Sequence, residues 1–188
     1  MTQATDPDHF ERLYAANPDP WAFTSSAYER EKYAATLAAL PDRRFVNGLE
    51  VGCSVGVLTR QLAARCDALL GLDGVEAAVS QARDCCAAQP WVRIERSLVP
   101  ADWPGGRFDL IVFSEVLYYL GSSGLRQTAS LARDSLLPGG VIALVNWLGE
   151  TGTGYGGTQA AEDFVVACGL RHDAAKQTEQ YRIDLLLG

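Results

Sequence analysis

The fold of this chain is decided by the stretch Leu49-Glu50-Val51-Gly52-Cys53-Ser54-Val55-Gly56, together with Asp73 further along. We interpret it as a buried strand that leads into a glycine loop and then a helix, followed by a second strand that ends in an acid. Such a loop suits a nucleoside, because glycines let the backbone approach the ligand and the acid accepts hydrogen bonds from ribose hydroxyls.

The spacing of the glycines separates two kinds of nucleoside site. A dinucleotide fingerprint has the pattern G-x-G-x-x-G, but here Ser54 and Val57 stand where its second and third glycines would be. The observed pattern, Glu50-x-Gly52-x-x-x-Gly56, resembles the first motif of the S-adenosylmethionine (SAM)-dependent methyltransferases. Two alternatives stay open: glycines that only form a tight strand–helix turn, and a nicotinamide-dependent reductase.

Strands and helices alternate after this motif, which predicts a parallel doubly wound sheet. We expect strands at residues 47–51, 68–73, 92–97, 108–114 and 141–147. We expect helices at residues 28–40, 56–65, 76–88, 124–135 and 158–168. The continuously apolar fourth and fifth strands indicate burial on both faces. Residues 170–178 and 180–187 predict an antiparallel hairpin at the sheet edge, whereas residues 1–28 are expected to be rich in loops.

The fold class that follows is α/β. With the resemblance, we expect a three-layer α/β/α doubly wound, Rossmann-like methyltransferase fold with a seven-stranded, mostly parallel sheet and an antiparallel C-terminal hairpin. We predict a single domain over residues 1–188, in which residues 1–40 form an N-terminal lid and helix and residues 45–188 form the core.

The composition disfavours several classes of function. The chain has 188 residues, 48% of them hydrophobic, and a formal net charge of −7. An acidic surface repels phosphate backbones, so we expect no nucleic acid partner. The lack of a long apolar run or a signal peptide predicts no membrane span and a cytoplasmic protein. Five cysteines without a C-x-x-C pair, and two histidines, predict reduced thiols and no metal site.

The methyltransferase resemblance implies which residues would hold SAM. They are Glu50, Gly52, Cys53, Gly56, Asp73, Gly74, Ser97, Leu98, Ser114 and Arg30. In this reading Glu50 helps hold the amino end of the methionine moiety and Asp73 binds the ribose. Arg30 pairs with the methionine carboxylate, unless it is a solvated helix charge. Ser97 stands where many family members carry the acid that binds adenine, and Leu98 would offer its backbone N–H there.

Longer segments carry a narrower resemblance. They are Asp19-Pro20-Trp21, residues 28–33, residues 47–53, residues 108–112 and residues 114–120. Together they resemble the nodulation protein S family of bacterial SAM-dependent N-methyltransferases. Its type member is implied to methylate the free amine at the non-reducing end of a deacetylated chitooligosaccharide. The resemblance covers residues 19–145, and the segment after Trp147 does not share it.

The catalytic candidates follow strand 108–114 and are Glu115, Tyr118 and Tyr119, with His172 as a more distant one. A carboxylate, phenol or imidazole there could take the proton that an amine acceptor must lose. Both tyrosines could equally cap the core with their hydroxyls in water.

Aromatic residues supply the substrate candidates, which are Trp21, Tyr28 and Trp147. Trp21 and Trp147 could stack on a sugar ring. With Tyr14, residues Trp21 and Tyr28 could fold over the site and exclude water. Trp21 could instead only anchor the N-terminal segment to the core.

The sequence therefore predicts a methyltransferase for a small-molecule acceptor, in first place an amine of a sugar or oligosaccharide. SAM is the expected cofactor, S-adenosylhomocysteine (SAH) its product, and a monomer or weak homodimer the expected state. An O-methyltransferase of a small metabolite and a catalytically silent SAM-binding regulatory protein remain alternatives.

Overall fold

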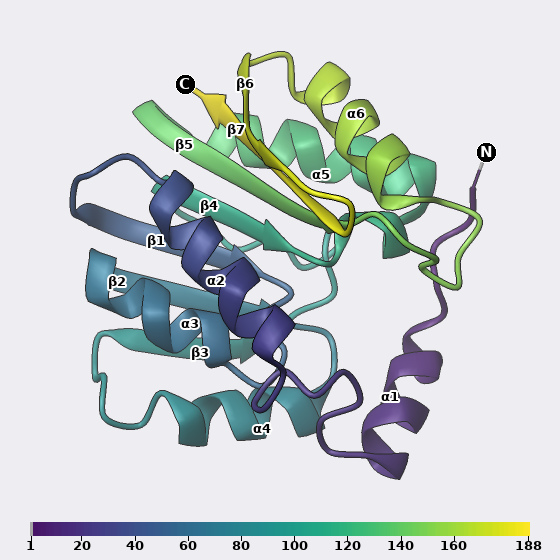
Figure 1. Cartoon of the computed structure of the whole chain (residues 1–188). Helices are drawn as coiled ribbons and strands as arrows, with labels where there is room; N and C mark the ends of the chain where they lie inside the picture. The colour runs from purple at the N-terminus through teal and green to yellow at the C-terminus, as the bar shows by residue number, and fades with distance from the viewer. Residues whose placement is uncertain (1) are drawn as a thin grey trace.

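A seven-stranded sheet forms the centre of the molecule, with helices on both faces (Figure 1). This computed structural model describes residues 2–188, with the side chains of residues 174 and 175 outside the description. The strands are β1 (Phe45–Val51), β2 (Cys66–Asp73), β3 (Val92–Arg96), β4 (Phe108–Ser114), β5 (Leu136–Trp147), β6 (Arg171–Gln177) and β7 (Tyr181–Leu187).

The strand order is β3-β2-β1-β4-β5-β7-β6. Strands β1 to β5 pair in parallel, whereas β7 is antiparallel to both β5 and β6. The doubly wound sheet with an antiparallel C-terminal hairpin is thereby confirmed. The order reverses between β1 and β4, so the crevice at the carboxyl ends of these two strands is the expected ligand site.

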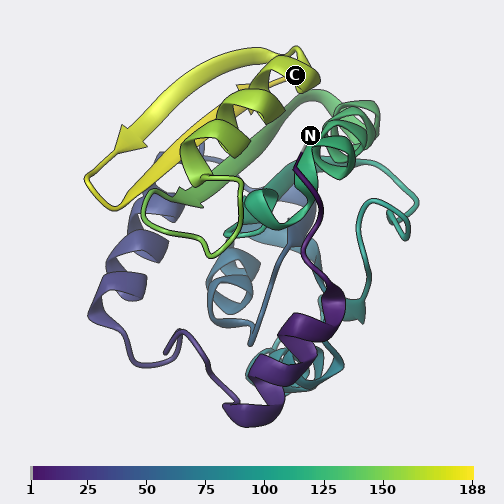
Figure 2. The ribbon, with the colours of Figure 1, turned by 90° about the vertical axis from the view of Figure 1, so that its right-hand side faces the viewer.

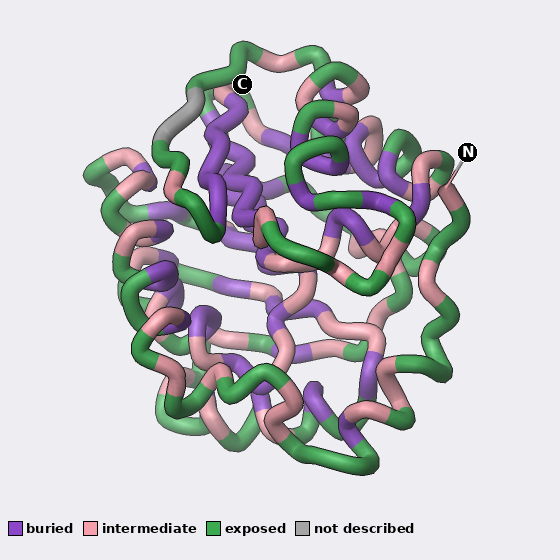
Figure 3. The backbone as a smooth tube through the Cα atoms, turned by 45° about the vertical axis from the view of Figure 1, so that its right-hand side comes forward, coloured by how far each residue is buried: buried purple, intermediate pink, exposed green. Residues whose placement is uncertain are grey.

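Two cores on opposite faces of the sheet fix the layers. Strand β4 is buried at every position, as its apolar sequence predicted. Ile111 and Phe113 pack in the core of α5 (Gly121–Ser135) and α6 (Gly157–Cys168), while Leu110 and Val112 pack in the core of α2 (Ala27–Ala39) and α3 (Val57–Leu62). The burial map shows buried chain through the centre of the sheet (Figure 3). Helix α4 (Glu76–Cys85) packs against β3 and α3.

The N-terminal region is more ordered than the sequence suggested, because residues 1–28 include the helix α1 (Pro7–Ala16). Asp6 caps this helix by accepting a hydrogen bond from the N–H of Asp8, and Pro7 takes the first turn, where no donor is needed. The many aromatic residues and prolines obscured this Asp-Pro start signal.

Strand β5 also begins earlier than predicted, at Leu136 instead of residue 141. Its pairing with β4 is irregular between Phe108 and Leu110, opposite the segment that contains Pro138. An irregular ladder tolerates a residue without an N–H donor, which is why the proline does not end the strand.

The extended N-terminal segment crosses the start of α5 before it reaches α1 (Figure 2). The N–H of Thr5 donates to the carbonyl of Tyr119, in the short helix η2 (Leu117–Tyr119), and the N–H of Ser122 donates to the carbonyl of Thr2. Gly121 makes this crossing possible, since a Cβ atom there would lie 2.5 Å from the backbone N of Ala4. Within residues 2–188, no helix has the length and apolar character needed to cross a membrane.

Candidate functional site

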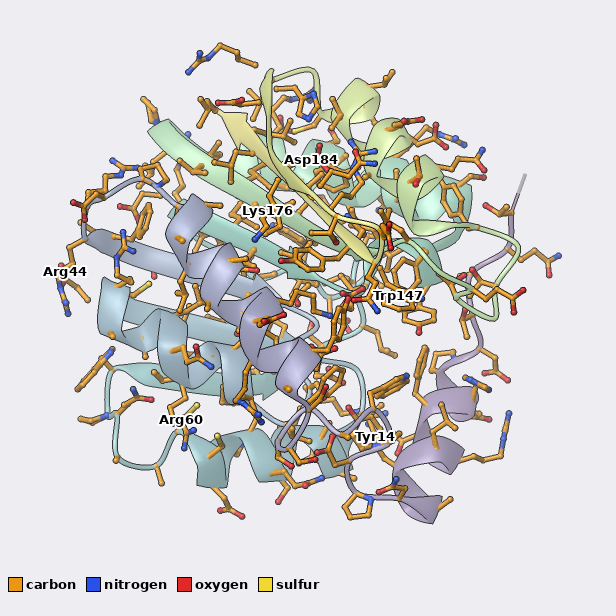
Figure 4. The ribbon with its side chains drawn as sticks, viewed as in Figure 1. Tyr14, Arg44, Arg60, Trp147, Lys176 and Asp184 are labelled. Carbon is orange, nitrogen blue, oxygen red and sulfur yellow. The ribbon has the colours of Figure 1, made fainter. Side chains whose placement is uncertain are left out.

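A cavity of about 1000 Å³ opens at the carboxyl edge of the sheet, at the reversal point between β1 and β4. The N-terminal segment, α1, α2 and the loops after β1, β2, β3, β4 and β5 contribute to its wall. Figure 4 labels Tyr14 on α1 and Trp147 at the end of β5 on this side of the sheet, whereas Arg44 lies at the opposite edge. The volume of this cavity is at the upper end of the range for a single small-molecule site.

The glycine loop forms the floor of the cavity next to β4. Gly52 has φ +83°, and a Cβ atom there would lie 2.8 Å from the carbonyl oxygen of Ser114. Both Gly52 and Ser114 line the cavity. The close approach of the two strand ends therefore requires glycine at residue 52.

Gly56, the second glycine of the motif, lies against α4. It has φ +84°, and a Cβ atom there would lie 2.8 Å from the Cα atom of Ala82. The described part of the cavity wall does not include Gly56, so this glycine lets α3 pack against α4. Cys53 is buried and lines a small recess beside the cavity.

Asp73 ends β2 with its carboxylate in the cavity wall. Oδ2 accepts a hydrogen bond from the N–H of Ser54 at 2.9 Å, and Oδ1 accepts one from the N–H of Val75 at 3.0 Å. These bonds fix the carboxylate and leave each oxygen able to accept another donor. Burial raises its pKa, which the hydrogen bonds from Val75 and Ser54 oppose. Gly74 lies beside it in the wall.

Ser97 and Leu98 line the same end of the cavity, after β3. The Ser97 hydroxyl donates to the carbonyl of Asp102 at 2.9 Å, and the N–H of Leu98 donates to Oδ2 of Asp102 at 3.2 Å. The Leu98 N–H that we expected to serve a ligand therefore has a partner within the chain. The sequence reasoning missed Asp102, which lies four residues beyond Leu98 in a loop.

Glu50 is buried at the end of β1, with 1% of its surface exposed. Among the described residues, neither of its carboxylate oxygens has a hydrogen-bond partner. Burial raises the pKa of Glu50 to about 8. It lines the recess that Gly52, Ser114 and Glu115 share with the main cavity. A buried carboxyl without partners is costly, so this position favours a ligand that brings a donor or a positive charge.

A buried charged cluster of Glu29, Lys32 and Glu115 forms the opposite wall. Nζ of Lys32 lies 3.0 Å from Oε1 of Glu29 and 2.5 Å from Oε1 of Glu115. Lys32 has only 2% of its surface exposed, although all three residues line the cavity. The cluster holds two carboxylates and one ammonium group, and so provides an excess of negative charge.

Glu115 is held from three directions. Oε1 accepts from Lys32, while Oε2 accepts from the Tyr118 hydroxyl and from the N–H of Trp147, both at 2.7 Å. Tyr118 is buried, and burial beside Glu115 raises its pKa well above the ordinary value. Tyr119 also lines the cavity, with its ring edge-on to Phe10 at 4.7 Å between centroids.

The aromatic candidates all line the cavity. The Tyr28 ring is edge-on to that of Trp147, with 5.5 Å between centroids, and Trp21 lies 5.8 Å from Tyr14 in the same way. These rings cover the space between the charged cluster and α1. They supply apolar faces to a ligand that reaches past the glycine loop.

Besides Gly56 and Cys53, two more candidates lie outside the cavity wall. Arg30 is exposed on α2 and its Nη1 donates to the carbonyl of Ser25, and His172 of β6 pairs with Asp184 at 2.7 Å. Neither belongs to the described cavity wall.

Glu29 and Lys32 line the cavity instead, and the sequence reasoning missed them. Their spacing of three on the helix face of Tyr33 and Thr36 was the available signal. In residues 2–188, no group of three or more metal-binding side chains is found.

Comparison with known proteins identifies relatives of this chain. The family model described as Nodulation protein S (NodS) matches residues 2–134. Nodulation protein S of Rhizobium tropici is 35% identical over 127 residues, which are 66% of this chain and 53% of that protein. The chain spans about half to three-fifths of the length of the first curated relatives that it matches.

Solved structures match over more of the chain. A crystal structure described as a putative methyltransferase from Pseudomonas syringae is 32% identical and covers 87% of this chain and 100% of its own, with a TM-score of 0.77. The N-methyltransferase NodS from Bradyrhizobium japonicum WM9, solved in complex with SAH, is 25% identical with a TM-score of 0.82. That match covers 96% of this chain and 97% of the other.

Proposed function

The chain belongs to the nodulation protein S family, and from this premise we propose that it is a SAM-dependent methyltransferase acting on an amine of a small molecule. One observation carries the proposal: a single cavity joins the glycine loop and Asp73 to the buried charged cluster. The first part suits a nucleoside and the second a cationic acceptor.

The residues present fit SAM. Asp73 would bind the ribose hydroxyls, and the partnerless carboxyl of Glu50 would meet the methionine amino end. Ser114, Gly74, Ser97 and Leu98 lie along the cavity between and beyond these two groups. Bound SAM would supply a methyl group already activated by its sulfonium, so the protein has mainly to align the acceptor and exclude water.

An amine acceptor fits the other wall better than a hydroxyl. The two carboxylates of the cluster exceed its one ammonium group, and burial makes such an excess costly unless another cation enters. The rings of Tyr28 and Trp147 add faces that attract a cation. Trp21 and Trp147 could each cover an apolar sugar face, so we propose an amino sugar or amino oligosaccharide as acceptor.

Residues of the N-terminal segment would close the site. Phe10 lies against Tyr119, and the hydroxyl of Tyr14 lies 2.6 Å from Oγ of Ser54 in the glycine loop. They therefore bridge the acceptor side and the cofactor side of the cavity and would keep water from the reacting groups. The five cysteines are free thiols, which supports our proposal of a cytoplasmic location.

Calorimetric titration with SAH, with NAD as control, tests the cofactor. We expect micromolar binding of SAH and none of NAD; the reverse would support a reductase and end the proposal. Methyl transfer from labelled SAM is then measured with a β-1,4-linked glucosamine tetramer, its N-acetylated form and a panel of hydroxyl acceptors. Transfer to the free amine is the expected result. Transfer to hydroxyls alone would indicate an O-methyltransferase, and SAH binding without any transfer a silent binding protein.

A further inference from the structure

Glu29 occupies an unusual position for a charged residue near the start of a helix. Its N–H donates to the Oγ of Ser26, the N-cap of α2, which fixes this first turn. Its side chain turns inward and lines the cavity, and the residue is only 6% exposed. The turn therefore holds a carboxylate in the cavity wall, where water cannot solvate it fully.

One of the two carboxylate oxygens of Glu29 is free to accept a further hydrogen bond. Oε1 accepts from Nζ of Lys32 at 3.0 Å, while Oε2 is buried without a hydrogen-bond partner among the described residues. A buried oxygen left in this state is costly, and more so when it is charged. Oε2 can therefore accept a hydrogen bond from a donor that a ligand brings.

In Glu115, the first candidate for a base, both carboxylate oxygens already accept hydrogen bonds. Lys32, Tyr118 and the backbone N–H of Trp147 together engage both of its oxygens. Three donors hold this carboxylate in one orientation. Glu115 therefore positions Lys32 and Tyr118, and the free oxygen of the cluster belongs to Glu29.

The aromatic wall next to Glu29 already attracts one cation, the ammonium group of Lys32. The Nζ atom of Lys32 lies 5.0 Å from the centroid of the Tyr28 ring, and Tyr28 is edge-on to Trp147. The carboxylate of Glu29, bonded to the same Nζ, is thus close to the Tyr28 ring, which lines the cavity. A carboxylate beside aromatic faces is a suitable subsite for an ammonium group.

We propose that Oε2 of Glu29 binds the ammonium group of the acceptor and takes its proton. This inference rests on the proposed function and adds to it a catalytic base that differs from the sequence candidates Glu115, Tyr118 and Tyr119. In the step, the N–H bond breaks, the proton bonds to Oε2, and the electron pair stays on nitrogen as the lone pair that methyl transfer requires. The charges of carboxylate and ammonium cancel, so no net charge is created in the buried site.

The environment of Glu29 suits this transfer. Burial raises its pKa, Lys32 and the Tyr33 hydroxyl oppose the rise, and Glu115 adds to it. The phenols of Tyr28 and Tyr33, on the same helix, also face the group. A raised carboxyl pKa is closer to the pKa of the amine, which makes the proton transfer less unfavourable.

The test compares Glu29→Gln, which keeps the shape but cannot take a proton, with Glu31→Gln, its exposed neighbour on α2. SAH binding to each variant is measured first and is expected to stay within about twofold of the parent value. The glucosamine tetramer is then titrated into each SAH-loaded protein at pH 7 in buffers of different ionisation enthalpy, which counts the protons released. We expect almost no net proton release for the parent and Glu31→Gln proteins, because the proton stays in the complex on Glu29. Glu29→Gln should bind the tetramer more weakly and release into the buffer the proton that the amine loses, up to one per site.

Turnover supplies the second readout. For Glu29→Gln we expect kcat at pH 7 to fall by about 10²- to 10⁴-fold and to recover as the pH approaches the pKa of the free amine. Glu29→Asp, a shorter base, should be slow but keep the parent pH profile. Equal proton release and equal pH profiles in the parent and Glu29→Gln proteins would overturn the inference, as would failure of the tetramer to bind SAH-loaded parent protein. Failure of SAH itself to bind would instead overturn the proposed function.

Discussion

The hydroxyl of Tyr14 lies 2.6 Å from Oγ of Ser54, which joins α1 to the glycine loop across forty residues of sequence. Ser54 has φ +48°, a conformation that a serine seldom adopts, and its N–H donates to Asp73. The three residues therefore form a chain of hydrogen bonds from the N-terminal helix to the acid of β2. Order in α1 and order in the loop should depend on each other.

Tyr14→Phe tests this connection. Loss of one hydrogen bond costs about 0.5–1.5 kcal/mol, so we expect SAH affinity to fall by about 2- to 10-fold. Tyr155→Phe is the matched control, because it removes a hydroxyl that bonds Asp163 and lies outside the described cavity wall. Calorimetry measures both. Equal affinity in the two variants would show that the contact does not support the loop.

Asp73→Asn addresses the ribose site. The amide can still accept a hydrogen bond but loses the charge, and a bond to a charged group contributes about 1.5–3 kcal/mol. We expect SAH affinity to fall by about 10- to 100-fold. Asp67→Asn, at an exposed position of the same strand, provides the control and should bind SAH normally. If Asp73→Asn also bound SAH normally, the ribose assignment would be wrong.

The sheet could be predicted from the sequence because its signals are local. The apolar run of residues 108–114 and the glycines after β1 identify elements without knowledge of their neighbours. Pairing then follows from the general preference of parallel strands for right-handed crossovers. The start of α1 at Asp6 was overlooked because prolines and aromatic residues in the same segment indicate loops.

The charged cluster could not be predicted, since its meaning depends on contacts distant in sequence. Arg30 and Lys32 are both cations on α2, and although the helical spacing places Lys32 on the face of Tyr33, it does not show that this face borders a cavity. Its partner Glu115, which follows β4 and lies 83 residues away in the sequence, shows that Lys32 points inward. In the same way, Gly56 matches a ligand-binding motif, but its close neighbour is Ala82 of α4.

Lys32→Met tests the energetic role of the cluster. The change leaves Glu29 and Glu115 buried together without their counter-ion, and breaking a buried pair in this way costs about 3–5 kcal/mol. We expect the free energy of unfolding, measured by urea denaturation, to fall by about this amount. The triple variant Glu29→Gln/Lys32→Met/Glu115→Gln removes all three charges and should recover most of the loss. No recovery would show that the lost packing of Lys32, and not the unpaired charge, caused the effect.

The last prediction concerns the pH dependence of stability. Burial raises the pKa of Glu50 from its ordinary value of 4.5 to about 8. Between these two values the folded protein holds a proton that the unfolded chain has lost, so Glu50 favours the unfolded state increasingly as the pH rises. Its contribution is a decline in the free energy of unfolding of up to about 1.4 kcal/mol per pH unit between pH 4.5 and 8.

Glu50→Gln isolates this contribution, because glutamine resembles the neutral carboxyl and does not titrate. In ligand-free protein we expect the variant and the parent to have similar stability near pH 5, and the variant to become the more stable of the two toward pH 8. Urea denaturation at a series of pH values measures both. Glu76→Gln, at an exposed residue paired with Arg83, should keep the parent slope and so controls for loss of a surface carboxylate. Parallel curves for the parent and Glu50→Gln proteins would mean that Glu50 is ionised in the folded state, so that its buried oxygens must find donors there.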